Sequence, residues 1–318
     1  VSGNSNMLGT NAVGNAVSGI NNELGASTLN NAVSGRSNTL GAAAGFNAIS
    51  GSINSLGANA ANNAISGAQN NLGVQAANNA VSGEGNELGD QAQRNAVFGQ
   101  QNRLRISATD NIVAGSANRI NGITSNSAVF GRGNILSEEA NSNLVGGVDN
   151  NIGLFASKNL VAGDDNSLGE DASRNLVTGR NNNLGANADL NSVSGGGNAL
   201  GEDALANAVS GGGNVLGNGS ENNAIFGQEN RLGFNRSAGP DGIFGTNDDL
   251  FVPAGTGDVG GNGNLVAGRE HALGQNSGFN VVGGLDNIVG DSSDTNLLTG
   301  GFNQVGDSSF NNAVSGFQ

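Results

Sequence analysis

Asparagine recurs every sixteen residues along most of the chain, and this period constrains the fold more than any other feature of the sequence. One series runs through Asn15, Asn31 and Asn47, and a second follows seven residues behind it through Asn22 and Asn38. A strict period this short is typical of one supersecondary unit stacked many times. The sequence therefore predicts a repeat architecture directly and a function only indirectly.

The repeat reads Asn-Ala-Val-Ser-Gly-x-x-Asn-x-Leu-Gly-x-x-Ala-x-x when Asn15 is taken as position 1. Positions 3 and 10 are aliphatic, position 5 is Gly, and position 14 is small. Positions 1 to 5 alternate as in a strand whose side chains point in and out in turn. Sixteen residues with two such stretches fit two short strands and two turns, not a pair of helices. We therefore expect an all-β parallel β-solenoid in which Val33, Leu40, Ile49 and Leu56 are buried.

Both Asn series alternate in step with the buried aliphatic residues, so we expect their side chains inside the coils or at their corners. Coils stacked at roughly 4.8 Å place identical amides above one another, where they can hydrogen-bond from coil to coil. An unpaired buried amide costs about 1–3 kcal/mol, which explains why exchanges are rare. The Gly at position 5 suits a corner that needs positive φ or leaves no room for a side chain. The predicted ladder residues include Asn31, Asn38, Asn47, Asn54, Asn207, Asn214 and His271, the single His, which replaces an Asn.

The repeat is interrupted once. We expect one structural domain consisting of a β-solenoid over residues 1–233, an insertion loop over 234–263, and a continued solenoid over 264–318. The insertion contains both Pro residues and a Gly-rich acidic run, whose oxygen ligands are of the kind that Ca²⁺ requires. A solvated acidic loop is the alternative. The predicted calcium ligands are Asp241, Asn247, Asp248 and Asp249, and no other cofactor is expected.

Charge and composition argue against several functions. The net charge of −14, with Lys158 as the single Lys, disfavours binding to nucleic acid or to anionic lipid. The absence of Cys excludes disulfides and thiolate metal sites. No apolar run approaches the length of a membrane span. No Ser/His/Asp set, phosphate loop or convergent carboxylate pair stands out from the repeat, so we expect a protein that is not an enzyme.

Positions 2 and 4 form the outward face of the first strand, and neither is ever charged. A large side chain at one of these positions is accompanied by a small one at the other: Phe98 follows Ala96, whereas Leu144 precedes Gly146. A large residue never occurs twice in one strand. Solvent imposes no such limit, whereas a packed interface does. Alternatively, small residues merely favour flat stacking, or the insertion covers the face. We predict self-association, laterally along this face or end to end, and the expected lateral contacts are Phe98, Phe130, Leu144, Leu160, Leu176, Phe226, Leu265 and Leu297.

The pattern Asn-x-Val-x-Gly-x-x-Asn, seen in residues 31–40 (NAVSGRSNTL), resembles the ice-binding proteins of grasses, whose repeats form a left-handed β-roll with internal Asn ladders. It is also similar to the left-handed β-roll heads of bacterial trimeric autotransporter adhesins. The chain departs from the grass repeat by lacking one residue before the second Gly, and from the adhesin repeat by having Asn where Ser or Ala is usual.

These resemblances imply a left-handed coil and an extracellular or cell-surface location of bacterial type. We expect a non-enzymatic structural or adhesive module whose partner is another copy of itself or a host or matrix surface. An ice-binding protein, acting as an antifreeze or inhibiting ice recrystallisation, is the alternative. The Ala and Ser rows up to Ser82 tolerate that alternative, whereas the later Leu and Phe residues and the scarcity of Thr oppose it.

Overall fold

The computed structural model describes residues 1–237, 250–253 and 261–317. It divides into two compact units, Val1–Phe155 and Ala156–Gln318. Each unit is a parallel β-solenoid with sixteen-residue coils, which confirms the expected fold class. None of the described residues belongs to a helix long and apolar enough to cross a membrane.

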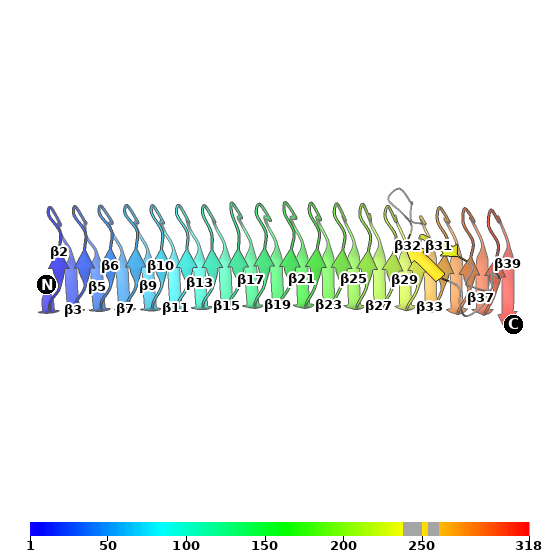
Figure 1. The fold of residues 1–318 in the computed structure, drawn as a ribbon, viewed down its shortest axis with the longest axis horizontal. Helices are drawn as coiled ribbons and strands as arrows, with labels where there is room; N and C mark the ends of the chain where they lie inside the picture. The colour runs from blue at the N-terminus through cyan, green and yellow to red at the C-terminus, as the bar shows by residue number, and fades with distance from the viewer. Residues whose placement is uncertain (238–249, 254–260, 318) are drawn as a thin grey trace. The chain divides into compact units, whose positions relative to one another are not determined.

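In the first unit, each complete coil contributes one five-residue strand and one two-residue strand. Strand β5 (Ala32–Arg36) pairs in parallel with β7 (Ala48–Ser52), and every residue lies beside the one sixteen positions later. Figure 1 shows these strands side by side in one direction. The other strands of this unit are β1 (Ser2–Asn4), β2 (Met7–Leu8), β3 (Ala16–Ile20), β4 (Glu23–Leu24), β6 (Thr39–Leu40), β8 (Ser55–Leu56), β9 (Ala64–Ala68), β10 (Asn71–Leu72), β11 (Ala80–Glu84), β12 (Glu87–Leu88), β13 (Ala96–Gln100), β14 (Arg103–Leu104), β15 (Ile112–Ser116), β16 (Arg119–Ile120), β17 (Ala128–Arg132), β18 (Ile135–Leu136), β19 (Leu144–Val148) and β20 (Asn151–Ile152).

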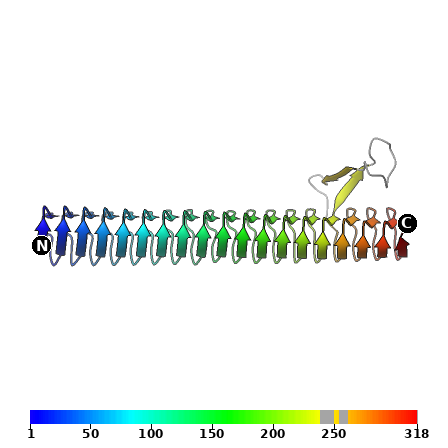
Figure 2. The ribbon, with the colours of Figure 1, turned by 90° about the horizontal axis from the view of Figure 1, so that it is seen from below.

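The second unit repeats this arrangement, and Figure 2 shows the long and the short strands as separate rows in each unit. Its coil strands are β21 (Leu160–Asp164), β22 (Ser167–Leu168), β23 (Leu176–Arg180), β24 (Asn183–Leu184), β25 (Ser192–Gly196), β26 (Ala199–Leu200), β27 (Ala208–Gly212), β28 (Val215–Leu216), β29 (Ala224–Gln228), β30 (Arg231–Leu232), β33 (Leu265–Arg269), β34 (Ala272–Leu273), β35 (Val281–Leu285), β36 (Ile288–Val289), β37 (Leu297–Gly301), β38 (Gln304–Val305) and β39 (Ala313–Phe317).

The core of each coil is thin and repeats from coil to coil. Val33 and Leu40, at positions 3 and 10, are 2% and 1% exposed, and Ile49 and Leu56 are equally buried, as predicted. The small residue at position 14 completes the core, and Ala44 has no exposed surface. Position 15 forms a third column of isolated parallel bridges, such as Leu29 with Gly45, which the two-strand pattern of the sequence did not predict.

The Gly at position 5 was predicted to lie at a corner, and this is wrong: it lies inside the five-residue strand. Gly51 in β7 has a φ of +128°, where residues with a side chain are strained. A Cβ atom added there would lie 1.8 Å from the carbonyl oxygen of Gly67 in the next coil. Both physical reasons given for the Gly are therefore correct, and only its place in the coil differs.

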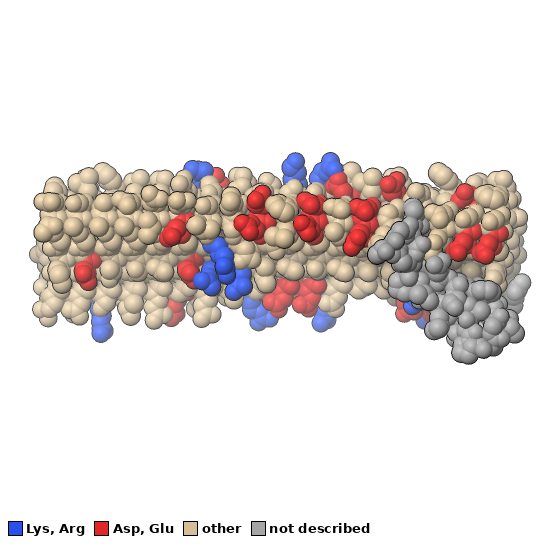
Figure 3. All heavy atoms as spheres, turned by 45° about the horizontal axis from the view of Figure 1, so that its top comes forward, with Lys and Arg blue, Asp and Glu red and all other residues tan. Residues whose placement is uncertain are grey.

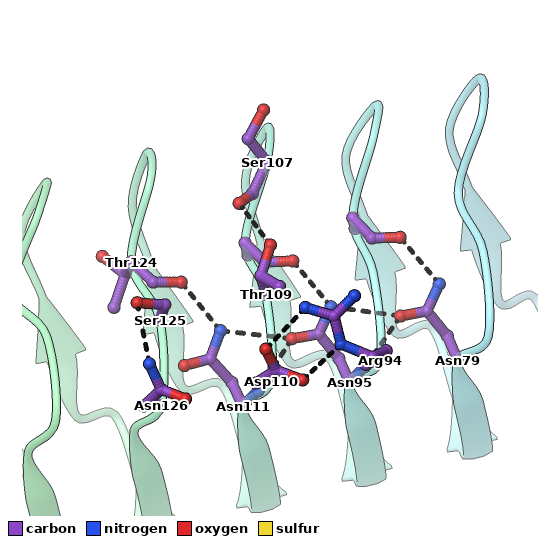
Figure 4. A network of polar contacts seen from close by, with 12 residues as sticks. Asn79, Arg94, Asn95, Ser107, Thr109, Asp110, Asn111, Thr124, Ser125 and Asn126 are labelled. Atoms are coloured by element: carbon purple, nitrogen blue, oxygen red, sulfur yellow. Dashed lines mark hydrogen bonds and ion pairs between the residues drawn. The ribbon is translucent and has the colours of Figure 1, made fainter.

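The Asn side chains form the predicted ladders. Asn47 donates from Nδ2 to Oδ1 of Asn31 at 3.0 Å and to the carbonyl oxygen of Ala60 at 2.9 Å. Its own Oδ1 accepts from the backbone N–H and from Nδ2 of Asn63, both at 3.0 Å. Figure 4 shows the same pattern further along the unit.

The second ladder and the remaining predicted members follow the same rule. Asn38 donates to Asn22 and to the carbonyl oxygen of Gly51, each at 3.0 Å. Ser127, the one miss in the first series, still accepts from the N–H of Asn143 through its hydroxyl oxygen. Asn54, Asn207 and Asn214 each donate through Nδ2 to the preceding coil, and His271 accepts through Nδ1 from the backbone N–H of Asn287 in the next coil.

The insertion leaves the ladder of the second unit unbroken. Asn264 bonds Asn223, 41 residues earlier, in the geometry that other pairs make across 16 residues, so the insertion adds 25 residues between these two partners (41 − 16). Strands β29 and β33 pair across it in register. Within the inserted residues, β31 (Phe234–Ser237) and β32 (Leu250–Pro253) form an antiparallel pair, which the sequence analysis did not predict.

Replacing Asn47 with Leu tests the ladder. The apolar side chain has a similar size but leaves the buried backbone N–H of Asn63 without its acceptor, and it removes one hydrogen bond each from Oδ1 of Asn31, the carbonyl oxygen of Ala60 and Nδ2 of Asn63. Because the orphaned N–H costs about 1–3 kcal/mol and each further lost bond about 0.5–1.5 kcal/mol, we expect the free energy of unfolding to fall by about 3 kcal/mol or more. Urea unfolding followed by circular dichroism measures it. Asn71→Leu, at an exposed position of β10, is the matched control, and an equal loss in both variants would contradict the ladder's role.

Candidate interaction face

The outward face of the first unit consists of positions 2 and 4 of successive five-residue strands. From β3 to β11 these positions are Ala and Ser in every coil, and the in-register pairing stacks them in two columns, as in Ala48 beside Ala64 and Ser50 beside Ser66. A shallow groove of about 750 Å³ follows these columns, and Phe98 of β13 contributes to its lining. The groove therefore contains apolar methyl groups and serine hydroxyls, and no charged side chain lines it.

Beyond the groove, large apolar side chains stand out from the same face. Phe98, Phe130 and Leu144 are each 42–45% exposed, which places these predicted contact residues at the surface. Ile112 is also 48% exposed at position 2, although it was not among the predicted contacts. Its pairing with the small Ala114 follows the same trade of bulk, and that signal could have identified it.

The second unit presents the same kind of face. The predicted contact residues there are all exposed, as is Val281, which pairs with Gly283 and was also overlooked. The exposed residues predicted here are Leu160, Leu176, Phe226, Leu265 and Leu297. Sequence reasoning thus recovered the face but not every large side chain on it.

Neither position 2 nor position 4 carries a charge, and some of the charged side chains elsewhere pair along the stack. Arg94 and Asp110 occupy the same repeat position in consecutive coils, with an N–O distance of 2.6 Å, beside the ladder formed by Asn95 and Asn111 (Figure 4). The guanidinium of Arg94 lowers the pKa of Asp110 by hydrogen bonding to its carboxylate. Figure 3 shows that the N-terminal part of the first unit presents few charges on the side in view.

The predicted calcium ligands Asp241, Asn247, Asp248 and Asp249 lie outside the described residues. Within the ranges that the structure describes, no group of three or more His, Asp or Glu side chains is arranged to hold a metal ion. The calcium site therefore stays a prediction from sequence.

His271 is a buried member of the second ladder, as the sequence predicted. Its Nδ1 accepts a hydrogen bond from the backbone N–H of Asn287 at 3.1 Å, which leaves the proton on Nε2, 3.3 Å from the carbonyl oxygen of Ala267. Burial lowers the pKa of His271 from its ordinary 6.5, whereas the Ala267 carbonyl and nearby Asp286 act to raise it. The residues that line the adjacent pocket of about 290 Å³ are Glu229, Arg231, Glu270, His271, Ala272 and Asp286.

This arrangement makes the stability of the second unit depend on pH. The unfolded chain takes up a proton at His271 as the pH falls through 6.5, whereas the folded coil resists it because burial disfavours the charged imidazolium. Stability is thus complete above that pH and decreases below it. We expect the thermal midpoint to drop between pH 7.5 and pH 5.5, and His271→Asn, which restores an amide to the ladder, to reduce the drop. Equal pH dependence in the two proteins would contradict this.

Comparisons with known proteins add little to these observations. No protein-family model matches the chain, and a sequence search of curated proteins finds no match. A solved structure with partial likeness is that of a Francisella novicida UDP-N-acetylglucosamine acyltransferase, which is 12% identical with a TM-score of 0.12. That match covers 63% of this chain and 60% of the acyltransferase chain, and at this TM-score it carries no argument about fold or function.

Proposed function

We propose that the chain is a non-enzymatic structural or adhesive β-solenoid module that associates with further copies of itself through its outward face. The observation that supports this most directly is the series of exposed large apolar side chains at positions 2 and 4, which are never charged. Phe98 and Phe226, for example, are each 45% exposed in the single chain. Within the first unit, Phe98, Ile112, Phe130 and Leu144 stand on four successive five-residue strands, and apolar surface gathered in this way usually marks an interaction site.

The location and the wider partners belong to the same proposal. The resemblance to adhesin heads favours an extracellular or cell-surface location, where a host or matrix surface would be a further partner. A net charge of −14 keeps such a module soluble while its uncharged face remains available for association. It also disfavours nucleic acid as the partner.

Charge introduced on the face tests self-association. Because each buried charge would lack a partner, Phe130→Glu/Leu160→Glu should convert the wild-type oligomer to monomers and leave the coils folded. Light scattering across a range of concentrations measures the mass, and circular dichroism checks the fold. We expect the apparent dissociation constant to rise by about a hundredfold or more.

The control is Ile53→Glu/Ile135→Glu, which adds the same charge at exposed apolar residues outside positions 2 and 4. This variant should associate like the wild type. A wild-type protein that is already a dispersed monomer at high concentration would overturn the proposal.

Ice binding is the second candidate, and the groove of the first unit favours it. Its Ala and Ser columns repeat in register over β3 to β11, which gives a regular, uncharged surface with methyl and hydroxyl groups. If this surface bound ice, Ser34→Arg/Ser66→Arg would abolish inhibition of ice recrystallisation, and Thr39→Arg/Asn71→Arg on the short strands would not. No inhibition by the wild-type protein would remove this candidate.

A further inference from the structure

We infer that two copies pack face to face about a two-fold axis parallel to the direction in which the coils stack, so that position 2 of each strand lies over position 4 of the same strand in the other copy. This inference rests on the proposed self-association and specifies its geometry. It applies to each unit separately.

The first unit carries the clearest pattern of large and small side chains. Along position 4, β13 to β19 present Phe98, Ala114, Phe130 and Gly146 in register. Along position 2, the same strands present Ala96, Ile112, Ala128 and Leu144. Each strand therefore has one large and one small outward residue, and the large one changes column from strand to strand.

A two-fold axis along the stack exchanges the two columns and keeps each strand at its own level. Phe130 then lies over Ala128 of the other copy, and Ile112 lies over Ala114 of the other copy. Packed sheets are separated by about 10 Å, a space that one large and one small side chain fill together. Two large residues in one strand would collide with each other across such an interface, which accounts for their absence from every strand.

The other face-to-face arrangement does not account for that rule. A two-fold axis across the stack keeps the columns and reverses the order of strands, so each large residue would meet a residue from a different strand. A strand with two large residues would then be acceptable opposite a strand with two small ones. The sequence contains strands with two small outward residues, namely the five-residue strands β3 to β11 and also β25, β27 and β39, yet none with two large ones.

Charge at the ends of β21 agrees with the same geometry. Lys158 precedes this strand, Asp164 ends it, and both are exposed. On one chain they lie about six extended residues, or roughly 20 Å, apart, too far to pair with each other. The axis along the stack exchanges the strand ends and brings Lys158 of each copy to the end that carries Asp164 of the other.

The contact does not extend over the whole first unit. From β3 to β11 both outward residues are small, so two sheets held apart by the side chains of β13 to β19 would not close on each other there. The groove lined by Ala and Ser would therefore remain open in the pair, and the contact would begin at β13.

Moving one large side chain within its strand tests the arrangement. Ala128→Phe gives β17 two large residues, and Phe130→Ala gives it two small ones, so each should weaken association by about tenfold or more. The double variant Ala128→Phe/Phe130→Ala exchanges the two positions, and its dimer should regain affinity to within about threefold of wild type. Its mixed pairs with wild-type chains should be disfavoured, because two Phe rings would then meet. Sedimentation measures the affinities.

The outcomes distinguish a failure of self-association itself from a failure of the two-fold axis along the stack. A monomeric wild type overturns both. A wild type that associates, with a folded double variant that does not recover, overturns only the two-fold axis along the stack, since an axis across the stack would press the new ring at position 128 against Ile112 of the other copy. Circular dichroism establishes folding.

An exchange of charge provides a second test that leaves the apolar face intact. Lys158→Glu and Asp164→Lys should each weaken association about threefold, and the double variant should recover. If the double charge variant does not recover, although the proteins still associate, the arrangement is also overturned.

The apolar substitution Ala128→Phe is itself compatible with the coil. Large side chains already stack in one column, as Leu160 and Leu176 do.

Discussion

The asparagine ladder is the interaction on which the rest of the structure depends. Each amide bonds the coil before it, the coil after it and a carbonyl group across the turn, as Asn47 does. These bonds fix the distance and the register between coils, and they satisfy buried polar groups that a thin core could not tolerate unpaired. Val33 and Leu40 then pack against their equivalents because the ladder has already placed them in line.

The ladder also explains how the second unit accommodates its insertion and its single histidine. The chain has 25 extra residues between Asn223 and Asn264, yet these two side chains still bond each other as neighbours in the ladder do elsewhere. His271 keeps the hydrogen bond to the backbone of the next coil through Nδ1, but it cannot supply the amide that donates to the preceding coil. The ladder thus tolerates a substitute that accepts the right bond, and here that substitute is a group that can titrate.

Because the inward positions are fixed by stacking, the outward positions are the ones free to vary, and their pattern is informative for that reason. Position 2 varies from Ala to Leu and position 4 from Gly to Phe, yet charge is absent from both and large residues never coincide in one strand. Nothing in the single chain requires this restriction, since Phe98 and Leu144 are exposed in it. We therefore attribute the absence of charge, and of two large residues in one strand, to contact with a second copy of the chain.

The sequence alone determined the coil length, the buried residues and the ladders, because strict periodicity places like residues above like and leaves one way to bury Val33, Leu40 and Asn47 together. It also identified most of the outward face, although Ile112 and Val281 were overlooked. Only the tertiary structure decided that the position 5 Gly lies within a strand, because that requires knowing how closely Gly51 approaches the backbone of Gly67. The groove, the third column of bridges and the environment of His271 likewise depend on distances between coils, which a one-dimensional pattern does not contain.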